Sequence, residues 1–167
     1  MLFQTGSENM RAEEINGADT ISEISLRPHH GMCLAYFEGK GYSVEFTVHM
    51  QNMLEILTKK KGFGENVNGG AKVRLTVCTD EICTACPNNI GALCREETRV
   101  RMFDQGVLET CQLEEGQVLD FEAFAGLVQR HIIDAGKRQD ICGGCQWESI
   151  CVNKESRWES LYAMGIR

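Results

Sequence analysis

The clearest pattern in the chain is an apolar residue at every third or fourth position between residues 43 and 60. Ser43 comes just before this pattern and is typical of a helix start, because its hydroxyl can accept a backbone N–H of the first turn. Gly62 and Gly64 follow it and favour the end of a helix. The segment therefore predicts a helix from Ser43 to about Lys60 with an inward face of Phe46, Met50, Met53, Leu54 and Leu57.

Strand signals are fewer and shorter. Lys72–Cys78 alternates polar and apolar residues and includes β-branched side chains, which predicts a strand. Residues 24–28 predict a short extended piece, because a residue before proline avoids the helical conformation. The run His29–Phe37 is compatible with a short helix or a buried strand, and its periodicity does not separate the two.

Further helices are predicted in the second half of the chain. They cover about Thr98–Thr110, Phe121–Ile133 with Asp120 as its cap, and a short amphipathic tail around Trp158–Met164. The whole pattern predicts a helix-dominated α+β fold: a small sheet of short strands, about four helices and two cysteine-rich metal-binding loops. Residues 1–22 are polar and lack periodicity, so we expect a flexible N-terminal extension followed by a single domain at residues 23–167.

Composition narrows the function classes. The 167 residues carry a formal net charge of −7, which argues against a nucleic-acid partner because no basic surface would meet a phosphate backbone. No segment reaches the roughly 18 consecutive apolar residues of a membrane span. The N-terminus has neither the basic start nor the apolar stretch of a secretory signal, so we expect a cytoplasmic location.

Nine cysteines are the unusual feature of the composition. In a reducing compartment disulfides seldom persist, and an odd number of cysteines cannot pair completely within one chain. Six of the nine form two groups, each a C-x-x-C followed by a third cysteine. A two-residue spacing lets one tight turn bring both thiolates to one metal centre. The groups are Cys83, Cys86 and Cys94, and Cys142, Cys145 and Cys151.

The identity of the metal stays open at this point. A zinc site of two C-x-x-C pairs would use Cys83, Cys86, Cys142 and Cys145 and leave two motif cysteines unexplained. An iron–sulfur cluster takes four thiolates, often three close together and one from elsewhere. Two triplets agree better with the second pattern, so a 4Fe–4S cluster is favoured and zinc is the alternative.

A second motif reads Arg27-Pro28-His29-His30-Gly31-Met32-Cys33. His29, His30 and Cys33 could complete a metal site, because imidazole binds both iron and zinc. The equally weighted alternative is a hydrogen-bonded structural histidine beside a packed cysteine, and the role of Arg27 stays open. Cys78 and Cys111 are expected to pack in the core, because free cysteine is among the most buried residue types. His49 and His131 lie in predicted helices without metal-ligand spacing and are expected to have structural roles.

The stretches LRPHHGMC, GKGYSVEF, DEICTACPNN and CGGCQW together resemble a family of small bacterial and archaeal proteins, domain of unknown function 1284. The resemblance covers roughly residues 24–152 and implies iron–sulfur binding, without a reaction or a partner. Its pattern falls on Arg27, Pro28, His29, His30, Cys33, Gly39, Gly41, Tyr42, Cys83, Cys86, Pro87, Cys94, Cys142, Cys145 and Cys151.

Three functions follow from these patterns. The favoured one is an iron–sulfur protein of electron transfer or redox sensing, with an unknown redox or protein partner. The alternatives are a structural zinc module and a cluster-dependent enzyme with an open coordination site near Arg27, His29 or His30. The enzyme is the least favoured, because the sequence has no phosphate-binding glycine loop, no GxSxG and no paired-carboxylate signature.

Overall fold

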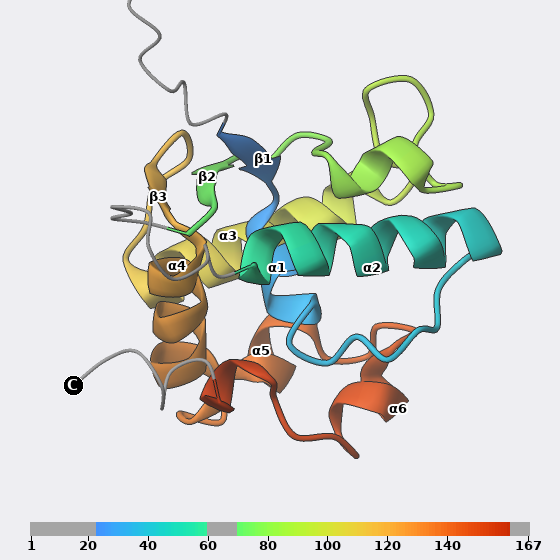
Figure 1. Ribbon diagram of the computed structural model, residues 1–167. Helices are drawn as coiled ribbons and strands as arrows, with labels where there is room; N and C mark the ends of the chain where they lie inside the picture. The colour runs from blue at the N-terminus through green and yellow to red at the C-terminus, as the bar shows by residue number, and fades with distance from the viewer. Residues whose placement is uncertain (1–22, 60–69, 161–167) are drawn as a thin grey trace, which may run out of the picture.

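The computed structural model describes residues 23–59 and 70–160. This part of the chain has the predicted helix-dominated α+β fold (Figure 1). The predicted N-terminal extension, residues 1–22, lies outside the described residues. The elements in chain order are β1 (Ile24–Leu26), α1 (Pro28–Cys33), α2 (Val44–Thr58), β2 (Lys72–Leu75), the 3₁₀ turn η1 (Ile82–Ala85), α3 (Glu97–Cys111), β3 (Val118–Asp120), α4 (Phe121–Val128), the π turn η2 (Gln129–Ile133), α5 (Arg138–Cys142) and α6 (Glu148–Cys151).

The sheet has three short strands in the order β1-β2-β3. β1 and β2 are parallel with Ile24 opposite Val73, whereas β2 and β3 are antiparallel with Val73 opposite Leu119. The predicted strand at 72–78 ends at Leu75, three residues early. Strand β3 carries no alternation long enough to be recognised in the sequence.

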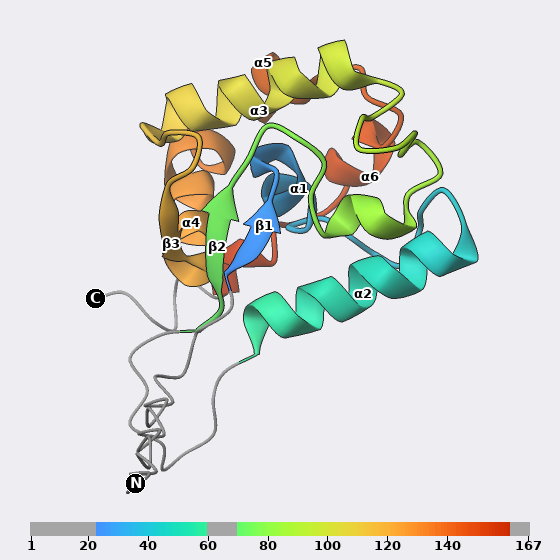
Figure 2. The same ribbon diagram turned by 90° about the horizontal axis from the view of Figure 1, so that it is seen from above.

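Two long helices enclose the sheet. Viewed from above, α2 lies on one side and α3 on the other, with α1 and the strands between them (Figure 2). α2 begins and packs as predicted: the Ser43 hydroxyl accepts the N–H of Phe46 at 3.1 Å, and all five predicted inward residues are buried. The run His29–Phe37 is helical as far as Cys33 and continues as a turn. Helix α1 starts at Pro28, a residue suited to the first turn because it needs no N–H partner there.

The predicted helix 121–133 is helical throughout but changes from α4 into the π turn η2 at Gln129. Asp120 precedes it without a side-chain cap, because its carboxylate binds Lys72 Nζ of the neighbouring strand at 2.9 Å. The segment Cys142–Cys151, predicted as a loop, contains the end of α5 and all of α6. The predicted tail helix starts at Trp158, and its residues after 160 lie outside the described part.

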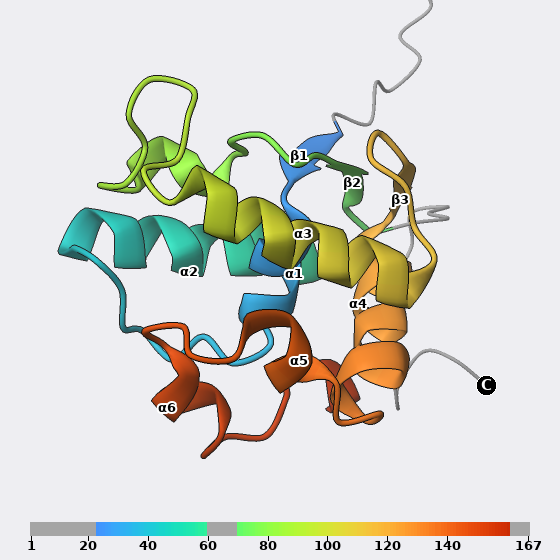
Figure 3. The ribbon, with the colours of Figure 1, turned by 180° about the vertical axis from the view of Figure 1, so that it is seen from behind.

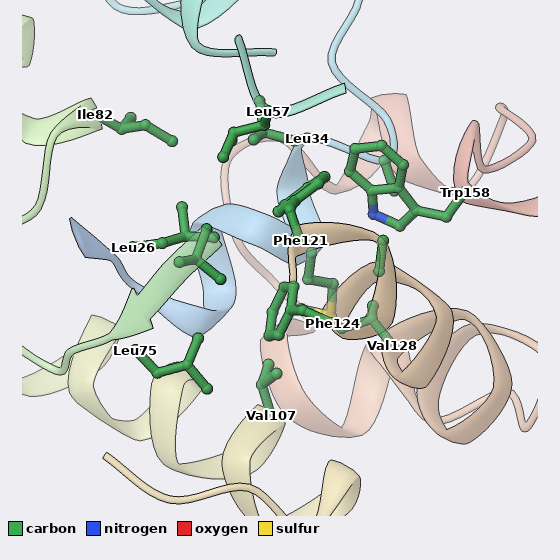
Figure 4. Packing of buried hydrophobic residues seen from close by; sticks show 14 of the residues in the cluster. Leu26, Leu34, Leu57, Leu75, Ile82, Val107, Phe121, Phe124, Val128 and Trp158 are labelled. Carbon is green, nitrogen blue, oxygen red and sulfur yellow. The ribbon is translucent and has the colours of Figure 1, made fainter. Parts of the chain in front are cut away.

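The main core packs α4, β1 and β2 against α1, with Phe121, Phe124 and Trp158 as its largest rings (Figure 4). Trp158 meets Phe121 edge-on at a centroid distance of 5.2 Å and donates its indole N–H to the Gly31 carbonyl at 3.2 Å. The C-terminal segment is thereby fixed to α1. In residues 23–59 and 70–160, no helix is long and apolar enough to cross a membrane.

Gly31 allows α1 to lie directly against Phe124 of α4. A β-carbon there would overlap Cε1 of Phe124, which is fully buried and has little room to move. We expect Gly31→Ala to lower the free energy of unfolding by about 1–3 kcal/mol, the usual cost of overpacking a core. Urea unfolding checks this, with Gly70→Ala as control because a β-carbon at Gly70 meets nothing within 4 Å. Equal stability of the two variants would contradict the packing argument.

Candidate metal centre

A cavity of about 440 Å³ lies where α1, the start of α2, the first half of α3 and two further segments meet. These segments are residues 79–96, here called the η1 loop, and residues 138–151, here called the α5–α6 segment. Figures 1 and 3 show the η1 loop on one side of α1 and α2, and α5 and α6 on the other. His29 and His30 line the cavity, and so do seven of the nine cysteines. These are Cys33, Cys83, Cys86, Cys94, Cys142, Cys145 and Cys151, all with free thiols.

The volume of the cavity is that of a site for a small ligand, which is typically about 300–1,000 Å³. It exceeds what one coordinated ion occupies. The two cysteine triplets, which are separated by α3 in the sequence, therefore line the same space in the fold.

The α1 residues reach the cavity through a buried ion-pair network. Arg27 Nε donates to Asp104 Oδ2 at 2.7 Å, and His29 Nδ1 lies 2.6 Å from Asp104 Oδ1. Burial opposes the charge of Asp104, but the contacts with His29 and Arg27 lower its pKa. Burial lowers the pKa of His29, and the neighbouring His30 lowers it further. Arg27 also contacts Glu97 at 3.4 Å, while its Nη2 has no partner among the described residues.

Asp80 contacts His30 in the same way that Asp104 contacts His29. Its Oδ2 accepts the backbone N–H of Arg27 at 2.6 Å and lies 2.9 Å from His30 Nδ1, while Oδ1 accepts the N–H of Cys83 at 3.1 Å. Burial alone would raise the pKa of Asp80, but the charge and hydrogen bond of His30 lower it to about 2. His30, Asp80 and Cys83 each offer one ligand atom, and these three atoms lie within 4.8 Å of one another.

Both histidines thus have Nδ1 held by a buried carboxylate. Metal-ligating histidines usually donate one ring N–H to such a partner, which fixes the orientation of the other nitrogen. Their rings are 4.2 Å apart at the centroids, so α1 presents two oriented imidazoles on the cavity wall. The arrangement can serve metal binding, and it equally ties α1 to α3 and to η1.

Cys33 belongs with the second triplet. Burial raises the pKa of the Cys33 thiol, and the charges of Cys142, Cys151 and Cys145 raise it further. Such effects require charged groups that are close together. Arg138 Nη1 approaches Cys142 Sγ at 3.8 Å and opposes the effect of burial, which raises the pKa of Cys142 to about 11. The Cys33 thiol therefore lies near the thiols of the second triplet and near the Arg138 guanidinium.

The first triplet has different neighbours. Cys86 donates its N–H to the Cys83 carbonyl at 3.0 Å, and the chain folds back so that Asn89 and Cys94 form a β-bridge. Burial raises the pKa of Cys86, and the charges of Cys94 and Asp80 add to this. Of the first triplet, Cys83 has its Sγ within 4.8 Å of ligand atoms of Asp80 and His30.

Two cysteines lie away from the cavity. Cys111 is buried in the core, as predicted, and burial raises its pKa to about 11. The prediction that Cys78 is packed in the core is wrong: its side chain is exposed, because β2 ends at Leu75 and the chain has left the sheet by Cys78. Because neither lines the cavity, Cys78 and Cys111 can serve as controls in substitutions of the seven cavity cysteines.

Residues 41–151 match the family described as Protein of unknown function (DUF1284). The chain belongs to the DUF1284 family. No curated protein and no solved structure matches the chain. The match includes both cysteine triplets, whereas Arg27, His29, His30 and Cys33 precede it.

The DUF1284 protein uses its remaining histidines elsewhere. His49 of α2 lies with Nε2 at 2.6 Å from the Glu81 carbonyl and at 3.1 Å from Thr84 Oγ1, so it joins α2 to η1. His131 is exposed in the π turn. Neither lines the cavity, and His49 has the structural role expected of it.

Sequence reasoning missed Asp80, Asp104 and Arg138. Arg138 acts on Cys142, four residues further along the chain. Asp80 and Asp104 are ordinary charged residues in their local sequence, and their importance comes from partners far along the chain: Arg27 is 77 residues from Asp104 and 53 from Asp80. A buried carboxylate needs such partners. No local spacing signals them.

The Asp80 pairing predicts a pH dependence of stability. The folded pKa of about 2 lies below the ordinary value of 3.8, so the stabilisation is complete above about pH 4 and is lost as the pH falls toward 2. The difference corresponds to about 2 kcal/mol. We expect the stability gap between the wild type and Asp80→Asn to shrink by about this amount between pH 5 and pH 2 in urea unfolding. A gap that is constant with pH would argue against the pairing.

Proposed function

We propose that this DUF1284 protein is an iron–sulfur protein that binds a 4Fe–4S cluster through Cys33, Cys142, Cys145 and Cys151. The observation that carries the proposal is the grouping of these four thiols, from α1 and from the α5–α6 segment, around one cavity. They form the set that such clusters use: three cysteines close in sequence and a fourth from elsewhere.

The surroundings of the four thiols suit a cluster. Cys142 is buried and the other three are half-buried, which limits the access of solvent. Cys145 Sγ accepts the N–H of Trp147 at 3.3 Å, and Arg138 places a positive charge next to Cys142. Backbone N–H groups and cations near the sulfurs stabilise the negative charge of thiolates.

A role in electron transfer or redox sensing agrees best with this donor set. A bound cluster would supply one-electron chemistry to a redox partner. Four cysteines would give every iron a protein ligand, which disfavours a cluster enzyme with an open coordination site. Arg27 and His29 are engaged by Asp104, so we assign them a positioning role. A reducing cytoplasm would keep the seven cavity cysteines available as thiols.

The test is anaerobic purification followed by a visible spectrum and by iron, sulfide and zinc analysis of the same sample. We expect about four iron and four sulfide per chain, with a broad visible absorption band. Cys33→Ser and Cys142→Ser should lose both the band and the iron. Cys78→Ser is the matched control and should keep them, because Cys78 lies outside the cavity. A colourless wild type, or a band that survives in both cavity variants, would remove the proposal.

Arg138 is expected to raise the midpoint potential of the proposed cluster. Its positive charge stabilises the more negative reduced state, so Arg138→Gln should lower the midpoint potential. A shift on the order of 60 mV corresponds to about 1.4 kcal/mol for one electron. Spectroelectrochemical titration measures it, and Arg138→Lys, which keeps the charge, should shift the potential less. Equal potentials in all three proteins would show that Arg138 does not act on the cluster.

A further inference from the structure

The proposed cluster uses four of the seven cavity cysteines, and the other three lie together on the η1 loop. We propose that Cys83, Cys86, Cys94 and His30 form a second, separate centre that binds a single tetrahedral metal ion of the zinc class. Three thiolates and one imidazole are an established donor set for structural zinc. The inference stands beside the proposed function and does not require the cluster to be present.

The turns of the η1 loop bring its three cysteines to the same cavity. The turn between Cys83 and Cys86 is closed by a backbone hydrogen bond of 3.0 Å. Asn89 Nδ2 donates to the Cys83 carbonyl at 3.1 Å, and the bridge between Asn89 and Cys94 returns the chain toward the turn. All three cysteines line the cavity. The loop therefore brings its three cysteines to the cavity wall without help from the second triplet.

His30 supplies the fourth donor from α1. One of its ring nitrogens lies within 4.8 Å of Cys83 Sγ and of an Asp80 oxygen. Zinc distances of about 2.3 Å to sulfur and 2.0–2.1 Å to nitrogen place neighbouring ligand atoms about 3.5–3.8 Å apart, so Cys83 and His30 need only small side-chain movements. Cys86 and Cys94 lie outside this group, and the loop would close around the metal to bring them in. Asp80 is already occupied by three donors, Arg27 N, His30 Nδ1 and Cys83 N. We therefore assign Asp80 the orientation of His30 rather than a place among the ligands.

The poor packing of this loop supports a metal. Between Cys86 and Glu97 no side chain is buried, and Ile90 and Leu93 are about half exposed, at 53% and 55%. A loop with so little buried apolar surface lacks the usual source of stability. Structural metals supply that free energy in such segments. A metal here would also fix η1 to α1 through His30.

Zinc, iron and sulfide are measured in anaerobically purified wild type, Cys94→Ser, His30→Ala and Cys151→Ser. We expect one zinc per chain in the wild type, a loss of most of it in Cys94→Ser and His30→Ala, and unchanged iron and sulfide in both. Cys151→Ser should keep its zinc and lose its iron and sulfide. Absence of zinc from the wild type, zinc that survives in both variants, or a parallel loss of iron in Cys94→Ser would overturn the second centre.

Two further measurements cover variants that fail to fold. X-ray absorption at the zinc edge of the wild type should report three sulfur ligands and one nitrogen, and four sulfurs would contradict the proposed ligands. His30→Cys should retain zinc with four sulfurs, since Cys₄ is also a zinc set. If iron is lost only in Cys151→Ser and zinc has other ligands, the cluster proposal stands and this one fails.

Discussion

Replacing Asp104 by alanine should lower the free energy of unfolding by about 3–5 kcal/mol. Asp104 is fully buried, and its carboxylate holds Arg27 Nε at 2.7 Å and both the backbone N–H and Nδ1 of His29. Its removal leaves a guanidinium that is only 1% exposed without its main counter-charge. Breaking one side of a buried pair is costly for this reason.

Urea unfolding measures the effect. Glu97→Gln is the matched control, because Glu97 also contacts Arg27, but at 3.4 Å and with a partly exposed side chain. It should lose about 0–1 kcal/mol, the usual contribution of such a pair. Similar losses in the two variants would mean that Arg27 does not depend on Asp104.

Trp158→Ala is expected to cost a similar amount, about 3–5 kcal/mol. The ring is fully buried against Phe121, and truncation would open a cavity between α4 and α1 that the rigid surroundings cannot close. It would also leave the Gly31 carbonyl without its indole donor. For a chain of this size the loss corresponds to a fall in the melting temperature of roughly 6–20 °C.

Calorimetry or thermal circular dichroism checks this prediction. Trp158→Phe separates the contribution of ring packing from that of the indole hydrogen bond. It keeps most of the ring contact and loses only the hydrogen bond and some volume. It should retain well over half of the stability that alanine removes. A melting temperature of Trp158→Ala within 2 °C of the wild type would show that the C-terminal segment does not contribute to the core.

Local sequence signals predicted the elements that depend on local physics. The three-four spacing and the Ser43 cap located α2 and its buried face, because helix capping and amphipathicity are properties of adjacent residues. β3 and the early end of β2 depend on pairing with distant strands, and three-residue strands carry no periodicity. Cys78 was misplaced for the same reason: its burial depended on how far the sheet extended.

The candidate site divides in the same way. Local motifs marked as candidates the seven cysteines and two histidines that line the cavity. The C-x-x-C triplets contributed six of the cysteines, and the Arg27–Cys33 stretch contributed Cys33 and the two histidines. Spacing did not assign Cys33 to a triplet, because that depends on the direction in which α1 crosses the fold. The carboxylates that hold the histidines were also missed, since Asp80 and Asp104 join α1 from separate segments.

The positions of the four proposed cluster ligands in the sequence determine when each becomes available during translation. Chains are made from the N-terminus, so Cys33 is available early and Cys151 is the last of the four to emerge. The three cysteines of the proposed zinc site are complete once Cys94 has been made. We therefore expect the proposed ion to be acquired while the chain is still growing, and the proposed cluster to be inserted only after translation has passed the second triplet.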